Sequence, residues 1–461
     1  MNVIVIVADS LRYDHLTPHG PSPAETPNLE AFAAESLLFE DCYAEGLPTM
    51  PARTAMWHGR FTGPFRPWQH FELTDIPIAE WLWDKGYTSA LITDVYHMHK
   101  PGMNVNRGFD ETHFIRGQEY DPWVVDEGID VSEGLARHYK PAPSGPEHTE
   151  LWRKRFEQYL RNISVRQGEE DYFVAQVVNR AIQWLDRHQG QDRLFLWVDC
   201  FDPHEPWDPP EALKRKYDPD YEGVDLIDPV PWEVAEYLTP EEMRHVQRLY
   251  AAEVEFVDRW VGKLLEAARA MGYLDDTLVL FTSDHGEPLD DHGIVRKCRP
   301  WNYEELAHVP LLIRLPGGEQ AGRRIQGFVQ HTDYAPTIYD FLGVEWPPGT
   351  TGDSFWPIIT GERESLRDFA VTAHCHQSWA LRTEQWTYQM MLRDQRISPS
   401  GSERGGRTGA IGFGAPRELF DRQTDRAEQH NVIEDHPEVA DELELKLRRF
   451  MGSLTWEQHR R

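Results

Sequence analysis

Short apolar runs without polar alternation, separated by helical segments, constrain the fold of this chain more than any other feature. Residues Val3 to Val7 are β-branched throughout. Such a strand is typically buried on both faces, in a parallel sheet with helices above and below it. Further strands are predicted at 88–92, 194–198 and 277–282, and helices from Pro27 and at 78–83, 172–188 and 241–271. The alternation predicts an α/β fold with a doubly wound, mostly parallel sheet.

The alternation weakens after Pro347-Pro348-Gly349, which suggests a domain boundary. We expect residues 1–365 to form the large α/β domain. Residues 366–461 are expected to form a smaller α+β C-terminal domain with short strands and a closing helix at 436–452. Two segments rich in proline and acidic residues, 115–170 and 205–240, are predicted to be insertions on the rim of the sheet.

Charge and composition exclude several classes of partner. The 461 residues include 47 Lys and Arg against 77 Asp and Glu, a net charge of −30. Nucleic-acid backbones and anionic membranes would be repelled by such a surface, so neither is expected as a partner. A small anionic substrate is still allowed, because a pocket can be locally positive. A homo-oligomer is compatible with the sequence.

Cysteine spacing and hydropathy indicate the compartment. Cys42, Cys200, Cys298 and Cys375 form no CxxC pair, so neither a disulfide framework nor a zinc knuckle is predicted. The apolar run at residues 3–7 is too short to cross a membrane and has no basic leader, and no later segment reaches about 18 apolar residues. We therefore expect a cytoplasmic protein.

Polar residues follow three of the predicted strands. Asp9 follows the first, Asp284 and His285 follow the strand at 277–282, and residues 199–204 follow the strand at 194–198. In open α/β sheets, ligands bind outside the carboxyl ends of the strands. Carboxylates and a histidine at one rim favour a divalent metal site. A helix N-cap is the alternative for Asp9 taken alone.

The segment from Leu47 to Arg60 contains a second group of polar residues. Pro51 suits the first turn of a helix, which places Thr49 at a helix N-terminus, where backbone N–H groups favour an anion. Arg53 lies one turn further on. A hydroxyl near a metal and an arginine is the layout of an activated nucleophile. The alternative is a plain threonine cap with a surface arginine.

Taken together, the motifs resemble the sulfatase family of the alkaline phosphatase superfamily. The resemblance runs the whole length of the chain and implies that family's α/β fold. The matching segments, in order, are residues 6–14, 49–60, 106–110, 202–207, 282–287, Lys297 ahead of 303–305, 309–314, 331–337 and 418–421.

The resemblance implies a role for each matching residue at the metal. Asp9, Asp284 and His285 would bind one divalent cation, of which Mn²⁺, Ca²⁺, Mg²⁺ and Zn²⁺ all suit such ligands. Thr49 occupies the nucleophile position of the family's Cys/Ser-x-Pro-x-Arg motif and would also contact the metal. Arg53 would orient the nucleophile and stabilise charge.

Three further residues are implied at the substrate. His204 and Lys297 would contact the substrate oxyanion, and one of them would protonate the leaving group. His97 lies near the family's Lys-x-His element, although the segment 93–97 departs from the usual sequence. A rim histidine without a role is the alternative for His97.

Three departures from the family pattern bear on function. Thr49 replaces the cysteine or serine that sulfatases convert to formylglycine, so no formylglycine is expected. Ser10 replaces the second aspartate of a tandem pair, and His285 replaces an asparagine. The single aspartate and the Asp-His-Gly form resemble the phosphonate monoester hydrolase and phosphodiesterase branch.

The expected function is a metal-dependent hydrolase of phosphate or phosphonate esters, either diesters or substituted monoesters, with Thr49 as nucleophile. A threonine alkoxide can attack phosphorus in line, whereas a sulfo-threonine would lack the hemiacetal route by which sulfate leaves formylglycine. The alternatives are a sulfuric ester hydrolase and a catalytically impaired binding protein. A two-metal variant would need further ligands from Asp199, Asp202, His374 or His376.

Overall fold

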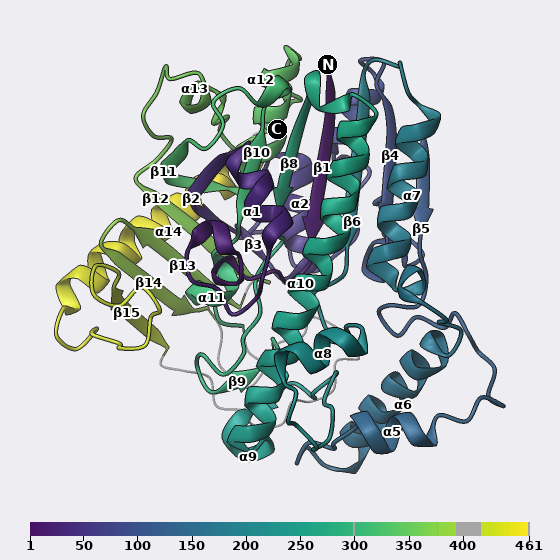
Figure 1. Ribbon diagram of the computed structural model, residues 1–461. Coiled ribbons are helices and arrows are strands. Elements are labelled where there is room, and N and C mark those ends of the chain that lie inside the picture. Colours follow the sequence, from purple (N-terminus) through teal and green to yellow (C-terminus); the bar gives the residue numbers. More distant parts are fainter. Residues whose placement is uncertain (298–299, 376, 393–415, 460–461) are drawn as a thin grey trace.

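An eight-stranded sheet forms the centre of the protein. The structure, a computed structural model, describes residues 1–297, 300–375, 377–392 and 416–459 (Figure 1). The strand order is β11 (Arg324–Gln330), β2 (Leu37–Tyr43), β10 (Leu311–Arg314), β8 (Thr277–Thr282), β1 (Asn2–Ala8), β6 (Leu194–Cys200), β4 (Thr88–Thr93) and β5 (Glu111–Phe114). Each neighbouring pair is parallel except those of β10, which runs antiparallel to β8 and β2. The mostly parallel sheet that the sequence predicts is confirmed.

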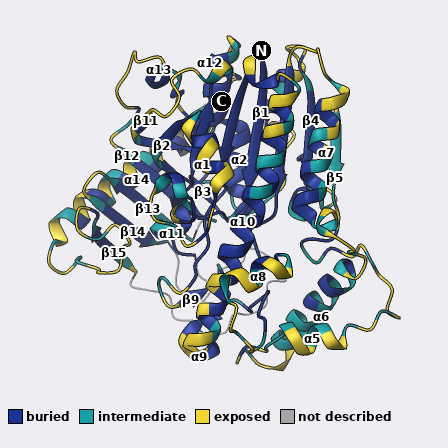
Figure 2. Ribbon diagram, viewed as in Figure 1, coloured by how far each residue is buried: buried dark blue, intermediate teal, exposed yellow. Residues whose placement is uncertain are grey.

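The central strand β1 is buried on both faces because its side chains enter two separate hydrophobic cores. Ile4 and Ile6 belong to one core, whereas Val3, Val5 and Val7 belong to the other. Successive side chains of a β-strand point to opposite faces of the sheet. A strand in which every residue is apolar therefore needs a hydrophobic layer packed on each face. Figure 2 shows the central strands as uniformly buried.

Helices supply that cover on the two faces. The face of Ile4 packs against α1 (Pro27–Ala34), α7 (Phe173–Arg187) and α10 (Pro240–Ala270). The opposite face packs against α2 (Thr49–His58), α3 (Ile78–Trp83), α4 (Tyr96–His99), α12 (Tyr334–Leu342) and α13 (Trp356–Ile359). The long helix α10 starts at a capping box in which Thr239 and Glu242 satisfy each other's backbone N–H groups. The arrangement is doubly wound, as expected.

The two predicted insertions contain helices that lie beyond the carboxyl ends of the parallel strands (Figure 1). The first holds α5 (Ser132–His138) and α6 (Pro146–Ile163). The second holds α8 (Glu211–Tyr217), β7 (Trp232–Glu233) and α9 (Val234–Tyr237), and β7 pairs with β9 (Ile294–Val295). Both segments therefore lie at the end of the sheet where α/β proteins bind ligands.

A second, five-stranded sheet forms most of the C-terminal region. It comprises β12 (Phe369–His374), β13 (Ser378–Thr383), β14 (Trp386–Met391) and β15 (Arg417–Asp421), and α14 (Pro437–His459) packs on it. Its fifth strand, β3 (Gly46–Leu47), comes from the N-terminal part and pairs with β12. The closing helix extends beyond the predicted residue 452. The boundary near residue 365 stays a proposal.

His292 links the loop after β8 to the C-terminal region and predicts a pH-dependent stability. Its Nδ1 lies 2.9 Å from Oε1 of Glu305, in α11 (Glu304–Ala307), and its Nε2 lies 2.9 Å from the Glu428 carbonyl oxygen. Burial acts to lower the pKa of His292, but Glu305 and Glu428 raise it from 6.5 to about 9. The protonated ring therefore stabilises the fold below pH 6.5, by up to about 3 kcal/mol, and this contribution is lost as the pH rises to 9. Thermal unfolding should show a steeper loss of stability over this range for wild type than for His292→Gln, and equal slopes would contradict the prediction.

The sequence predicts neither a disulfide framework nor a membrane-spanning segment. Cys42, Cys200 and Cys375 have free thiols, and Cys298 lies outside the described residues. In the described part of the chain, every helix is too short or too polar to cross a lipid bilayer.

Candidate active site

Three predicted metal ligands meet where β1 and β8 end. Asp9 directly follows β1, and Asp284 and His285 follow the neighbouring parallel strand β8. One ligand atom from each of the three lies within 4.8 Å of the other two, and all three residues are buried. The parallel register brings the two strand ends to the same rim, so the sequence spacing of about 275 residues becomes a local cluster.

The imidazole of His285 is oriented as a metal ligand would be. Its Nδ1 lies 2.8 Å from the carbonyl oxygen of Gly286, so Nδ1 carries the hydrogen and Nε2 keeps a lone pair. A backbone carbonyl on the second ring nitrogen is the usual way to fix a ligating histidine. Burial lowers the pKa of His285 to about 4, so the ring is neutral at pH 7 and able to bind a cation.

The electrostatics of the two aspartates also fit a bound cation. Burial and the neighbouring Asp284 raise the pKa of Asp9 well above its ordinary value. Burial acts in the same direction on Asp284, but His285 and Arg53 lower its pKa to about 2. Two buried carboxylates this close repel each other unless positive charge lies between them. The donor set, two carboxylates and a neutral imidazole, therefore suits a divalent ion.

Arg53 supplies part of that positive charge from inside the protein. Its guanidinium contacts Asp284 Oδ2 at 2.5 Å, Asp199 Oδ1 at 2.6 Å and Asp9 Oδ2 at 3.1 Å. Its Nη1 also donates to the carbonyl oxygen of Thr49 at 3.2 Å. Arg53 is therefore a buried residue that fixes the two predicted ligand carboxylates and the start of α2, not a surface side chain.

Thr49 lies at the start of α2, as the position of Pro51 predicts. Pro48 caps the helix and Thr49 is its first residue. The Thr49 hydroxyl lies 3.5 Å from His285 Nε2, and only 3% of the residue is exposed. A helix N-terminus favours negative charge at this point through its free N–H groups. The structure thus brings the predicted nucleophile beside the predicted metal ligands.

Lys297 lies beside Asp9 through the hydroxyl of Ser10. Its Nζ donates to Ser10 Oγ at 3.1 Å, and Ser10 Oγ donates to Asp9 Oδ1 at 2.8 Å. Nζ also pairs with Glu287. Burial acts to lower the pKa of Lys297, but Glu205, Glu287 and Asp9 raise it, so the ammonium stays charged.

His204 follows β6 and packs against Phe201, with ring centroids 4.1 Å apart and the ring planes tilted by 30°. Burial, Lys297 and Arg296 lower the pKa of His204 well below its ordinary value. The charge of Lys297 therefore acts both on His204 and on the predicted metal ligand Asp9.

The remaining predicted site residue, His97, lies on α4. Its Nε2 lies 2.5 Å from Glu119 Oε1, and its Nδ1 lies 2.8 Å from Lys100 Nζ. Burial lowers the pKa of His97, and Arg53 is among the cations that lower it further. Both ring nitrogens of His97 thus have partners within the protein, and its role in the reaction stays a prediction.

The residues named for a second metal ion do not gather at the first. Asp199 forms two hydrogen bonds with Arg53, and Asp202 is held by Gln118 and the Val174 backbone N–H. His374 Nδ1 lies 3.4 Å from the carbonyl oxygen of Trp301, and His376 lies outside the described residues. Within the described ranges, Asp9, Asp284 and His285 are the set of three His, Cys, Asp or Glu side chains close enough to share an ion.

Sequence reasoning missed three buried charged residues around Lys297. Glu287 pairs with Lys297, and Glu205 lies near both Lys297 and His204. Arg296 pairs with Glu205 and Asp228. Glu205 and Glu287 lie inside matched motifs, one or two residues from predicted site residues. That proximity was a usable signal, but their pairing partners are distant in sequence and could not be seen.

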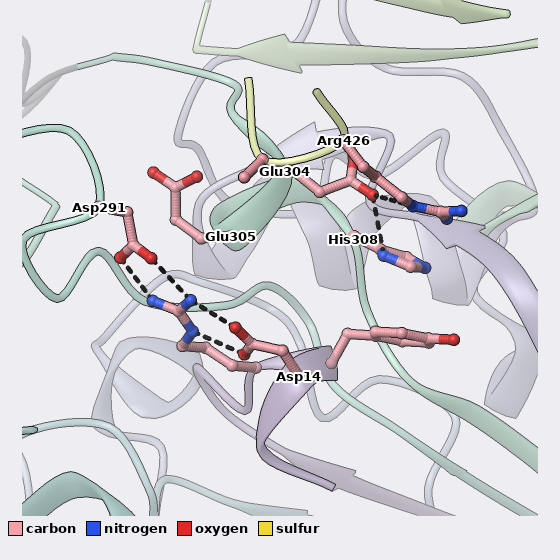
Figure 3. A pocket seen from close by; sticks show the side chains of 9 residues that line it. Asp14, Asp291, Glu304, Glu305, His308 and Arg426 are labelled. Carbon is pink, nitrogen blue, oxygen red and sulfur yellow. Dashed lines mark hydrogen bonds and ion pairs between the residues drawn. The ribbon is translucent and has the colours of Figure 1, made fainter. Parts of the chain in front are cut away.

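A separate hollow of about 300 Å³ lies near the segment after β1 (Figure 3). Asp14 and Asp291 both bind the Arg12 guanidinium there, and Glu304 binds Arg426 and His308. Its lining among the described residues includes none of the predicted ligands or catalytic residues. Its acidic groups are thus satisfied within the protein.

Replacing Lys297 tests whether the buried ammonium stabilises charge during the reaction. Lys297→Ala should lower kcat by about 10²–10³-fold, the usual effect of losing one preorganised charge stabiliser. KM should change less, and Lys216→Ala on the surface of α8 provides a control. Steady-state kinetics give the answer, and an unchanged kcat would place Lys297 outside the reaction.

Comparison with known proteins identifies relatives along the whole chain. Choline-sulfatase of Rhizobium meliloti is 26% identical over 498 aligned positions, covering 99% of this chain and 87% of the relative. N-acetylglucosamine-6-O-sulfatase of Bacteroides thetaiotaomicron is 26% identical, covering 81% of this chain and 74% of the relative.

Solved structures show the same fold. The phosphonate monoester hydrolase of Agrobacterium radiobacter superposes with a TM-score of 0.72 at 22% identity, covering 98% of this chain and 96% of that one. The phosphonate monoester hydrolase of Silicibacter pomeroyi gives 0.71 at 22% identity, covering 100% and 95%. The sequence model of the Sulfatase family matches residues 1–344. The chain therefore belongs to the sulfatase family, as its motifs predicted, and is a hydrolase that acts on esters.

Proposed function

We propose that this protein hydrolyses phosphate or phosphonate esters, either diesters or substituted monoesters, with Thr49 as the nucleophile. The observation that carries the proposal is the hydroxyl of Thr49, which lies 3.5 Å from His285 Nε2 at the N-terminus of α2. A threonine has a methyl group on Cβ and cannot become the aldehyde that sulfatases use. A hydroxyl nucleophile suits transfer of a phosphorus group, which water then removes.

A divalent cation held by Asp9, Asp284, His285 and the Thr49 hydroxyl would lower the pKa of that hydroxyl and withdraw charge from the ester. The chain's own residues have complementary tasks. Arg53 holds the two aspartates and the first residue of α2 in place. Lys297 stays protonated beside Asp9 and would stabilise negative charge that develops on the ester oxygens.

Two of the structural neighbours support phosphorus over sulfur. Both are phosphonate monoester hydrolases, and they cover nearly all of this chain. The motif departures at Ser10 and His285 point the same way. These similarities support the proposal together with Thr49, because fold alone does not choose a substrate.

The second candidate is a sulfuric ester hydrolase that uses Thr49 directly. It is favoured by the printed activities of the sequence relatives, a choline-sulfatase and an N-acetylglucosamine-6-O-sulfatase. In such an enzyme, a sulfo-threonine would have to be cleaved by water without a hemiacetal route. We rank this candidate second for that chemical reason.

The stereochemical outcome at phosphorus tests the proposal. A chiral aryl phosphorothioate diester should be hydrolysed in ¹⁸O water with retention, because attack by Thr49 and attack by water each invert the configuration. Inversion would mean that water attacks the ester directly, and it would contradict a Thr49 intermediate. The assay needs metal-loaded protein and phosphorus NMR of the product.

A further inference from the structure

The carboxylate of Glu205 lies among three nitrogen-bearing side chains, those of Arg296, Lys297 and His204, beside the candidate site. Its Oε1 pairs with Arg296 Nη2, while its Oε2 lies 3.2 Å from His204 Nδ1 and 3.7 Å from Lys297 Nζ. Glu205 is only 2% exposed, and Oε2 has no hydrogen-bond partner among the described residues. A buried carboxylate oxygen without a hydrogen bond is costly, so a functional reason for it is expected.

The neighbouring ring of His204 is oriented by the same residue. Its Nδ1 lies 2.8 Å from the Glu205 carbonyl oxygen, so this nitrogen carries a hydrogen. The Nδ1–H therefore points to the carbonyl oxygen, and the carboxylate Oε2 of Glu205 lies 3.2 Å from the same nitrogen. Nε2 is left as the ring nitrogen that can exchange a proton with a substrate.

The other charges around the ring oppose its protonation. Burial lowers the pKa of His204, and the positive charges of Lys297 and Arg296 lower it further. Glu205 is the carboxylate in contact with the ring. The charge of Glu205 also acts on Glu287, Asp228 and Tyr120, whose pKa values are raised by burial and raised further by this charge. A protonated His204 thus depends on the charge of Glu205.

We propose that Glu205 is a positioning residue that stabilises the His204 imidazolium, so that His204 Nε2–H protonates the leaving oxygen of the ester. This inference rests on the proposed function, that is, on ester hydrolysis at Thr49. As the bond from phosphorus to the leaving oxygen breaks, its electron pair stays on that oxygen and takes the Nε2 proton. The ring becomes neutral and keeps its other proton on Nδ1, which donates to the Glu205 carbonyl oxygen.

Arg296 fixes Glu205 for this task. Its guanidinium also binds Asp228 Oδ1 at 2.6 Å and the Pro229 carbonyl at 2.9 Å, and it lies 4.9 Å from the ring centre of Trp152 in α6. Because the guanidinium is held from three sides, the carboxylate of Glu205 is held beside His204. Residues of both insertions thus contribute to the position of one proton donor.

Leaving-group dependence separates this role from a structural one. In metal-loaded Glu205→Gln, kcat for a 4-nitrophenyl ester should stay within about threefold of wild type, because nitrophenolate leaves without a proton. For the matching phenyl ester, kcat should fall by about 10²-fold, the scale of general acid catalysis. The alkaline limb of the kcat profile for the phenyl ester should also move to lower pH. His204→Gln should likewise lower kcat far more for the phenyl ester than for the 4-nitrophenyl ester. The double variant of Glu205→Gln and His204→Gln should show no further loss.

Two companion variants keep the test decisive. Asp228→Asn removes one of the groups that hold Arg296, so it should lower kcat for the phenyl ester more than for the 4-nitrophenyl ester, but less than Glu205→Gln does. Glu205→Asp keeps the charge opposite Arg296 and protects the fold. Its kcat should fall by about tenfold for the phenyl ester, while kcat for the 4-nitrophenyl ester stays near that of wild type. Equal losses on both esters in either Glu205 variant, or no loss on the phenyl ester, would overturn the inference. The series uses whichever ester class wild type cleaves, so turnover of sulfate esters alone would refute the proposed function and leave the Glu205 test intact.

Discussion

Thr49→Ala should abolish turnover, by at least about 10⁴-fold, while the protein still binds its metal ion. The loss is large because removal of a nucleophile leaves only the binding and charge-stabilising groups. Asp9, Asp284 and His285 remain in place, so the metal content by elemental analysis should match wild type. Thr49→Ser should stay partly active on phosphorus esters, because it keeps the hydroxyl and only loosens its rotamer.

The same helix provides a matched control. Thr54 lies in α2 with its hydroxyl bonded to the Met50 carbonyl at 2.7 Å, so Thr54→Ala should keep its activity. Thr49→Cys, co-expressed with a formylglycine-generating enzyme, should gain turnover of sulfate esters. If Thr49→Ala kept wild-type turnover, the nucleophile assignment would be wrong and attack by water would have to replace it.

Asp284→Asn should lose most of the bound metal and with it nearly all activity. The substitution removes a full negative charge from a site in which two carboxylates hold the cation. Arg53 would then keep only Asp9 and Asp199 as ion-pair partners. Chelation should lower the Tm of wild type, because a ligand that binds only the folded state stabilises it, by about 2.7 kcal/mol at a hundredfold excess over Kd.

An aspartate at the other end of β8 provides a control for this prediction. Asp276 precedes the strand at the opposite end from Asp284, on the surface. Asp276→Asn should therefore keep metal content, activity and the Tm shift on chelation. Full metal content in Asp284→Asn, measured by elemental analysis after dialysis, would refute its assignment as a ligand.

The strands and the rim of the sheet were predictable because they depend on local pattern. An apolar run such as Val3–Val7 requires burial on both faces, and the rule for strand ends then selects Asp9 and Asp284. The position of Thr49 followed from Pro51, whose ring fits the first turn of a helix. Each of these inferences needs only neighbours in sequence and one general rule of α/β folds.

What the sequence did not reveal depends on contacts between distant segments. Arg53 was expected to face an anion, but three carboxylates from three different strands surround it. The pairing of Glu205 with Arg296 depends on how the second insertion folds against the loop after β9. The pairing of β3 with β12 was also not visible, since a two-residue strand has no periodic signal.

The ratio of kcat/KM for a matched aryl sulfate and aryl phosphodiester, measured on metal-loaded wild-type protein, tests the central claim most directly. Both esters share one leaving group, so the ratio reports only the preference of the site for sulfur or phosphorus. We predict a clear preference for the phosphodiester, because Thr49 provides a plain hydroxyl and no aldehyde hydrate. A preference for the sulfate by about tenfold or more, which is about 1.4 kcal/mol of transition-state stabilisation, would contradict the account.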